Sequence, residues 1–158
     1  MSHPASLSPL VTLLGQAERE RDDAVAMARR VEAAHQSAIA QAEQLAAYRG
    51  DYEARYRETF SRKAGIEQLQ TYQGFMNRLS LAVDQQRQIV AQAERRVEIA
   101  RQAVREQEMR VASVRKLIER RMAELRLAAD RREQKQMDEF ATRAAWNRLN
   151  EQQLSQSA

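Results

Sequence analysis

Cysteine is absent from the chain, and proline, glycine and aromatic residues are scarce. Without cysteine, the chain has no disulfide framework and no thiolate that could serve as a nucleophile or metal ligand. Both prolines, Pro4 and Pro9, lie near the N-terminus, so no proline interrupts a helix beyond Leu10. Aromatic residues make up only 5% of the chain, which argues against a compact core of the usual kind. These absences favour an elongated helical protein.

Long apolar runs and the usual signatures of catalysis are also missing. No window approaches the roughly eighteen consecutive apolar residues of a membrane span, and the N-terminus has no secretory signal pattern. We therefore expect a cytoplasmic protein without membrane insertion. The chain has no glycine-rich phosphate loop and no HExxH zinc motif. Its two histidines are His3 and His35, and we predict no enzymatic activity, no metal site and no cofactor.

Charge is abundant but mixed in sign. Charged residues make up 30% of the chain, and the net charge is +4. Bases and acids alternate closely, as in the segment Glu94-Arg95-Arg96-Val97-Glu98. This pattern is typical of a solvated helix face with ion pairs one turn apart. An Arg-rich nucleic-acid binder stays open as an alternative, and its binding would fall steeply with salt.

Apolar residues recur every seven positions along the second half of the chain. The series comprises Met76, Val83, Val90, Val97, Val104, Val111, Ile118 and Leu125, with Leu79, Ala93, Ala100, Val114 and Ala128 at the companion seam positions. A period of 3.5 residues held over this length predicts a left-handed coiled-coil seam. A weaker repeat of the same period extends from about Leu10 to Thr59.

A turn separates the two repeats, at Ser61-Arg62-Lys63-Ala64-Gly65. The sequence thus predicts an all-α fold, a long antiparallel two-helix coiled-coil hairpin with an overhanging C-terminal helix. The expected parts are a flexible N-terminus (1–9), a first helix (10–60), the turn (61–65), a second helix (66–149) and a flexible tail (150–158). With the turn centred on Ala64, facing residue numbers sum to 128, which pairs Val31 with Val97 and Ala38 with Val90. From about residue 116 the second helix has no partner within the chain, so we expect it to dock on another protein, pair with itself or fray.

Two stripes with the same spacing approach the turn from either side. They are Gln41-Leu45-Tyr48-Tyr52 and Phe75-Leu79-Ala82-Gln86, and matching members pair across the hairpin. Tyr48, Phe75 and Ala82 flank the seam, where a two-helix hairpin cannot bury them fully. Exposed Tyr and Phe side chains commonly anchor a protein partner. From the residues alone, a binding surface and plain seam packing both stay open.

Several motifs together resemble one family. They are Leu45-x-x-Tyr48-x-x-x-Tyr52, then Ala64-Gly65-Ile66, then Tyr72-Gln73-x-Phe75, and finally Gln134-Lys135-Gln136-Met137-Asp138-Glu139-Phe140-Ala141-x-Arg143-Ala144-Ala145. This arrangement resembles the flagellar type III export protein family FliJ, and the likeness extends from about Leu7 to Ala145. The last motif is the most specific part, because heptads alone would match many proteins.

The resemblance implies a stalk-like hairpin that inserts into the hexameric export ATPase (FliI) and links it to the cytoplasmic domain of the export gate (FlhA). It also implies the ATPase regulator FliH and export chaperones as partners, at the inner-membrane face of the flagellar base. The gate contact is expected on Gln41, Leu45, Tyr48, Tyr52, Phe75, Leu79, Ala82 and Gln86, the last of which is commonly His in relatives. The ATPase contact is expected on Leu117, Arg121, Leu125, Gln134, Lys135, Asp138, Glu139 and Phe140. The stalk of an injectisome system and a coiled-coil scaffold that dimerises through the overhang remain alternatives.

Overall fold

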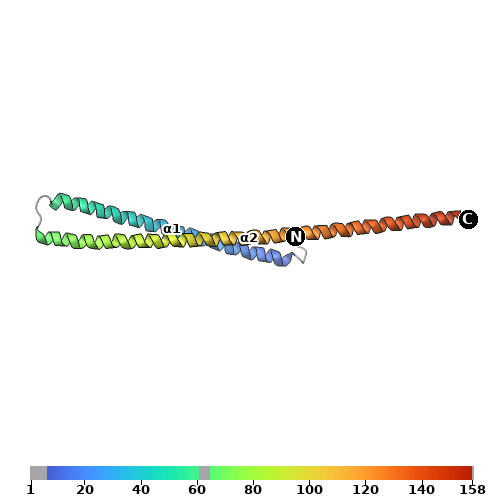
Figure 1. Ribbon diagram of the computed structural model, residues 1–158, viewed down its shortest axis with the longest axis horizontal. Coiled ribbons are helices and arrows are strands. Elements are labelled where there is room, and N and C mark those ends of the chain that lie inside the picture. The colour runs from blue at the N-terminus through green and yellow to red at the C-terminus, as the bar shows by residue number, and fades with distance from the viewer. Residues whose placement is uncertain (1–6, 61–64, 158) are drawn as a thin grey trace. The chain divides into compact units, whose positions relative to one another are not determined.

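Two long helices account for nearly all of the chain that the structure describes. A computed structural model describes residues 7–60 and 65–157, and within them the elements are α1 (Ser8–Phe60) and α2 (Ile66–Gln156) (Figure 1). The predicted all-α fold of two helices that pack against each other is therefore confirmed. The predicted turn lies outside the described residues except for Gly65. Residue contacts divide the chain into two compact units, one formed by residues 17–110 and the other by 1–16 with 111–158.

The helix ends follow local chemistry. Helix α1 begins at Ser8 rather than at residue 10, because a proline such as Pro9 is tolerated in the first turn, where its missing N–H would have no helical acceptor. Helix α2 begins after Gly65, whose carbonyl accepts a 3.1 Å hydrogen bond from the N–H of Leu69. It ends at Gln156 rather than at the predicted residue 149. The Gln, Glu and Leu residues in this last stretch are good helix formers, and no breaker stands among them.

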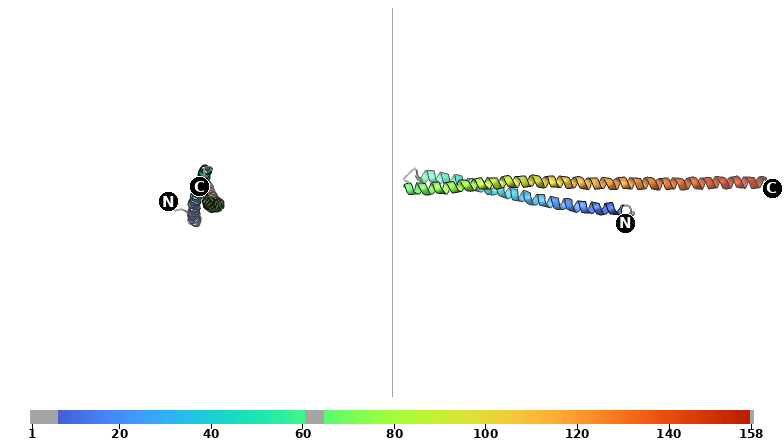
Figure 2. Two further views of the ribbon diagram at one scale, coloured as in Figure 1. Left: turned by 90° about the vertical axis from the view of Figure 1, so that its left-hand side faces the viewer. Right: turned by 60° about the horizontal axis from the view of Figure 1, so that its bottom comes forward.

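Within residues 17–110, α1 and α2 form an antiparallel pair. Figures 1 and 2 show these parts of the two helices lying side by side as they lead away from the turn. The seam between them buries small and branched residues, namely Ala17, Ala38, Leu79, Val83, Val97 and Ala100. Because alanine projects little beyond the backbone, Ala on α1 and Val on α2 let the two helices approach closely. The apolar heptad positions therefore form the core of this unit.

Ion pairs also connect the two helices of this unit. Arg101 and Glu32 form a salt bridge of 3.1 Å, and Arg110 forms a second one with Glu20. All four side chains remain more than a third exposed, so each pair contributes at most about 1 kcal/mol to stability. Their main effect is to occupy arginines of the mixed-charge face with partners from the same chain.

The other unit combines the start of α1 with the C-terminal part of α2. Leu7, Val111 and Val114 are buried there, so the first turns of α1 cover the seam of α2. From residue 119 to residue 157, all described side chains are exposed except the half-buried Leu125 and Ala144. Across residues 7–60 and 65–157, neither helix has a stretch apolar and long enough to cross a bilayer.

Candidate partner-binding surfaces

The first candidate surface lies on the antiparallel pair near the turn. We call it the aromatic patch, and it comprises Gln41, Leu45, Tyr48, Tyr52, Phe75, Leu79, Ala82 and Gln86. The structure brings its two stripes together from α1 and α2, but it exposes their members unequally. Gln41 and Tyr48 are exposed, Leu79 and Gln86 are buried, and the other four residues are half-buried. The accessible part of the patch is thus smaller than the full set of eight.

Ring contacts between the helices shape this patch. The Tyr52 and Phe75 ring centroids are 4.5 Å apart, and Tyr48 meets Phe75 edge-on at 6.4 Å. Tyr56 stacks on Tyr72, in agreement with the predicted pairing of residues whose numbers sum to 128. Such contacts hold Phe75 and Tyr52 in place while leaving Tyr48 51% exposed. Tyr48 is consequently the aromatic side chain of the patch best placed to insert into a partner.

Gln86 has a different environment from the rest of the patch. Its side chain is 8% exposed, and its Nε2 donates to the carbonyl oxygen of Ala38 at 3.0 Å and to Oε1 of Gln41 at 3.3 Å. The sequence analysis did not predict that Gln86 is buried and hydrogen-bonded to α1, although the sequence contains one indication of it. Gln86 interrupts the companion seam series between Leu79 and Ala93, and a polar residue at a seam position implies a partner across the seam.

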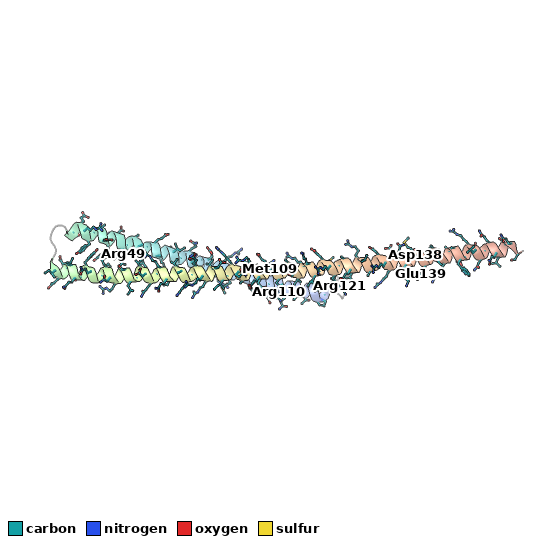
Figure 3. The ribbon with its side chains drawn as sticks, viewed as in Figure 1. Arg49, Met109, Arg110, Arg121, Asp138 and Glu139 are labelled. Carbon is teal, nitrogen blue, oxygen red and sulfur yellow. The ribbon has the colours of Figure 1, made fainter. Side chains whose placement is uncertain are left out.

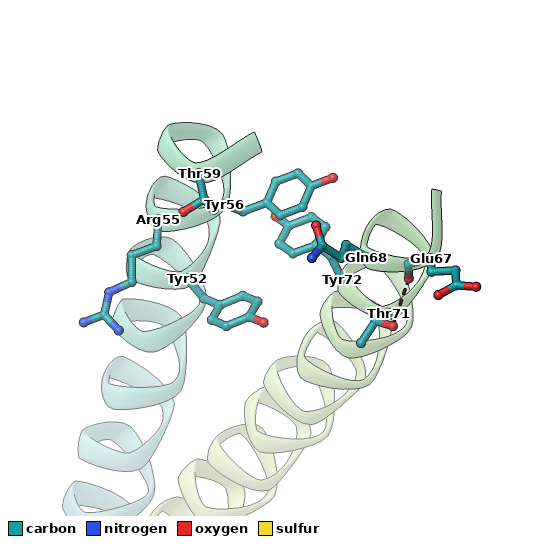
Figure 4. A pocket seen from close by; sticks show the side chains of 8 residues that line it. All are labelled: Tyr52, Arg55, Tyr56, Thr59, Glu67, Gln68, Thr71 and Tyr72. Atoms are coloured by element: carbon teal, nitrogen blue, oxygen red, sulfur yellow. Dashed lines mark hydrogen bonds between the residues drawn. The ribbon is translucent and has the colours of Figure 1, made fainter. Parts of the chain in front are cut away.

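Beyond the patch, the ends of the helices next to the turn line an open pocket of about 460 Å³. Figure 4 shows Tyr52 and Tyr56 of α1 directed toward α2, which contributes Tyr72, Glu67 and Thr71 to the pocket. Burial raises the pKa of the Tyr72 phenol, and the Glu53 carboxylate raises that pKa further. The phenol of Tyr72 is therefore neutral at physiological pH, and it offers a hydroxyl rather than a negative charge to this pocket.

Three seam positions that interrupt the apolar repeat contain buried polar atoms without a hydrogen-bond partner. They are His35 Nδ1, Arg49 Nε and Gln107 Oε1. His35 lies among carboxylates and guanidinium groups along the side of the helix pair, including Glu94 and Arg95. In the described part of the chain, no three His, Asp or Glu side chains are grouped closely enough to hold a metal ion.

The second candidate surface is the C-terminal part of α2, which we call the overhang (residues 116–156). The structure exposes Leu117, Arg121, Gln134, Lys135, Asp138, Glu139 and Phe140 and half-buries Leu125. Figure 3 labels Arg121, Asp138 and Glu139 on this helix. Large apolar side chains are exposed along it, including Met122, Leu127, Met137, Phe140, Trp146 and Leu149. An unpartnered helix with this much exposed apolar surface is typical of a segment that packs on another protein.

Positive charge is concentrated at the start of the overhang. Residues 116–135 contain seven Arg or Lys and four Asp or Glu. Helical periodicity places Lys116, Arg120, Arg131 and Lys135 on one face, which also contains Glu124. Arg121 is engaged by Glu124 at 3.1 Å. This face is suited to a partner surface that carries acidic groups.

Comparisons with known proteins cover both surfaces. A family model described as "Flagellar FliJ protein" matches residues 6–150, which include both helices up to the last turns of α2. The chain belongs to the flagellar FliJ family. A FliJ protein of Salmonella typhi is 32% identical over 136 residues, which is 86% of this chain and 92% of that protein. A FliJ protein of Escherichia coli K12 is 34% identical over the same shares. Membership in the FliJ family supports a component of flagellar protein export.

Proposed function

We propose that this chain is a non-enzymatic stalk and adaptor of the flagellar export apparatus. In this proposal the overhang enters the ring of the export ATPase FliI, and the aromatic patch contacts the cytoplasmic domain of the export gate FlhA. The chain also works with the regulator FliH and escorts export chaperones, in the cytoplasm at the inner-membrane face of the flagellar base. The observation that carries the proposal is the family match across residues 6–150, which spans the aromatic patch and the overhang up to residue 150.

The overhang supports the ATPase part of this proposal. It is a single helix with exposed apolar side chains and a basic stretch. After Leu125, no other described segment of the chain packs on this helix. An asymmetric helix within the pore of a hexamer would contact its subunits unequally and so bias their conformations during ATP hydrolysis. The chain would supply no chemistry of its own to that reaction.

The aromatic patch supports the gate part of this proposal. The ring of Tyr48 contacts the rings of Phe75 and Tyr52, and about half of the residue remains exposed to solvent. An aromatic side chain with few rotatable bonds, already restrained by neighbouring rings, loses little conformational entropy on binding. This is one reason why Tyr is enriched at binding hot spots. The family model and both relatives described above are flagellar, which supports assigning these surfaces to the flagellar system.

Binding of the full chain to FliI and to the FlhA cytoplasmic domain, each measured separately, tests this function. Tyr48→Ala combined with Phe75→Ala should weaken FlhA binding at least about tenfold, the loss typical of hot-spot residues, and leave FliI binding unchanged. The matched control is Leu81→Ala with Ile89→Ala, which truncates two exposed apolar side chains of α2 outside the patch. Circular dichroism verifies that each variant keeps its helices. Normal FlhA binding by the Tyr48/Phe75 variant would show that these two residues serve only to pack the seam.

A further inference from the structure

Gln86 occupies a seam position where apolar residues are the rule. Its neighbours in the same series of α2 are Leu79 and Ala93, and the adjacent ladder residue Val83 is 2% exposed. At 8% exposure, Gln86 is the only polar residue among residues 7–59 and 65–157 that is almost wholly buried. A buried amide is costly unless its hydrogen bonds are made, so its retention in the seam calls for partners.

Both partners of the Gln86 amide lie on α1. Its Nε2 group has two hydrogens, and the two acceptors are the carbonyl oxygen of Ala38 at 3.0 Å and Oε1 of Gln41 at 3.3 Å. Ala38 is itself buried, whereas Gln41 is exposed at the edge of the aromatic patch. The Gln86 side chain therefore links the interior of the seam to the patch surface.

The apolar seam alone discriminates poorly between alignments of the two helices. The ladder on α2 repeats valine every seven residues, so a slip by one heptad would place Ala38 against Val83 or Val97 instead of Val90. Apolar contacts are non-directional, and one valine replaces another at little cost. Hydrogen bonds are directional, and a slip of seven residues would carry Gln86 away from both of its acceptors.

We propose that Gln86 is a positioning residue that sets the register of α1 against α2 and orients Gln41. A polar residue that forms hydrogen bonds across a coiled-coil seam favours the register in which those bonds are made. The correct register is what brings Tyr48 and Tyr52 of α1 beside Phe75 of α2. The effect of Gln86 on the gate rests on the function proposed above. In that case Gln86 positions the exposed patch residues and does not itself contact FlhA.

Thiol cross-linking tests the register, because the chain has no cysteine of its own. Ala38→Cys with Val90→Cys reports the native alignment, and Ala38→Cys with Val97→Cys reports the slipped one. Each pair is treated with a short bifunctional thiol reagent, and the intramolecular product is quantified by mass spectrometry. Gln86→Met should raise the slipped product roughly fivefold or more relative to the native product. The matched control Gln85→Met, which changes an exposed glutamine beside it, should leave the ratio unchanged.

An unchanged ratio in the Gln86→Met chain would overturn the register assignment. Circular dichroism shows whether each variant remains helical. If methionine itself disturbs the seam, Gln86→Ala removes the same two hydrogen bonds without adding bulk, and the same rise in the slipped product is expected.

Locking the register separates positioning from direct contact. Gln86→Met should weaken binding to the FlhA cytoplasmic domain. When that chain also carries Ala38→Cys and Val90→Cys, joining the two introduced thiols should restore binding to the level of the cross-linked chain with Gln86. Binding that stays weak in the locked chain would show that Gln86 itself contacts the gate, which contradicts the inference. If the unmodified chain does not bind FlhA at all, the proposed function fails, while the cross-linking ratio still decides the register.

Discussion

At the scale of single residues, heptad position decides which side chains the helix pair can bury. Val97 is 5% exposed, whereas Ile99, two positions further along the same helix, is 70% exposed. The two side chains are similar in size and polarity, so the difference comes from the face of α2 on which each lies. A two-helix seam has only one buried stripe on each helix, and residues outside it contribute little to stability.

Val97→Asp should therefore unfold most of the helix pair. The substitution places an unpaired carboxylate in the seam, which we expect to cost about 3–5 kcal/mol of unfolding free energy. Circular dichroism at 222 nm and the thermal midpoint measure the loss of helix. The matched substitution Ile99→Asp introduces the same charge at an exposed position and should leave both nearly unchanged. Equal behaviour of the two variants would contradict the seam.

At the scale of elements, both helices contain a glycine near the turn that no packing requirement explains. A Cβ atom added at Gly50 of α1 or Gly74 of α2 would meet no other atom within 4 Å. Neither glycine has a positive φ. Each glycine therefore weakens its helix through backbone entropy alone, within two residues of an aromatic side chain that contacts the other helix.

Gly50→Ala and Gly74→Ala should each stabilise the chain by about 0.5–1 kcal/mol, since alanine fits and restricts the unfolded backbone. Thermal unfolding followed by circular dichroism measures the gain, and hydrogen exchange locates it near the turn. The reverse substitution Ala54→Gly, at an exposed position of α1, should lower stability by a similar amount. A destabilised alanine variant would show that the glycines serve a close contact.

At the scale of the whole molecule, the two candidate surfaces belong to different compact units. The aromatic patch lies within residues 17–110, and the overhang lies within the unit that contains residues 111–158. The apolar seam of the first unit includes Leu79, Val83 and Val97, and it uses no residue of the overhang. The two proposed partner contacts should consequently be separable by truncation.

Removal of residues 116–158 should abolish stimulation of the FliI ATPase and preserve binding to the FlhA cytoplasmic domain. ATP hydrolysis by FliI and a pulldown with FlhA measure the two effects. A shorter truncation of residues 151–158, which lie beyond the family match, should leave both intact. Stimulation of FliI by the chain that lacks 116–158 would refute the assignment of the overhang.

The fold could be predicted from local pattern because a coiled coil repeats one physical requirement along the chain. The seven-residue step of Val83, Val90 and Val97 specifies a helix with a single apolar stripe, and a break at residues 61–65 specifies where the chain reverses. The ends were less predictable. Pro9 and the polar residues after 149 suggested flexible segments, but a first-turn proline and a run of helix formers both continue a helix.

The sequence by itself determined the two helices, their antiparallel pairing and the stripes that contain the patch residues. Only the tertiary structure decided which members of those stripes remain accessible, with Tyr48 exposed and Leu79 and Gln86 buried. It also decided that Gln86 bonds to Ala38 and Gln41. The physical reason is that heptad position assigns a residue to a face, whereas exposure and hydrogen bonding depend on how closely the two helices approach and which rotamers the gap between them allows.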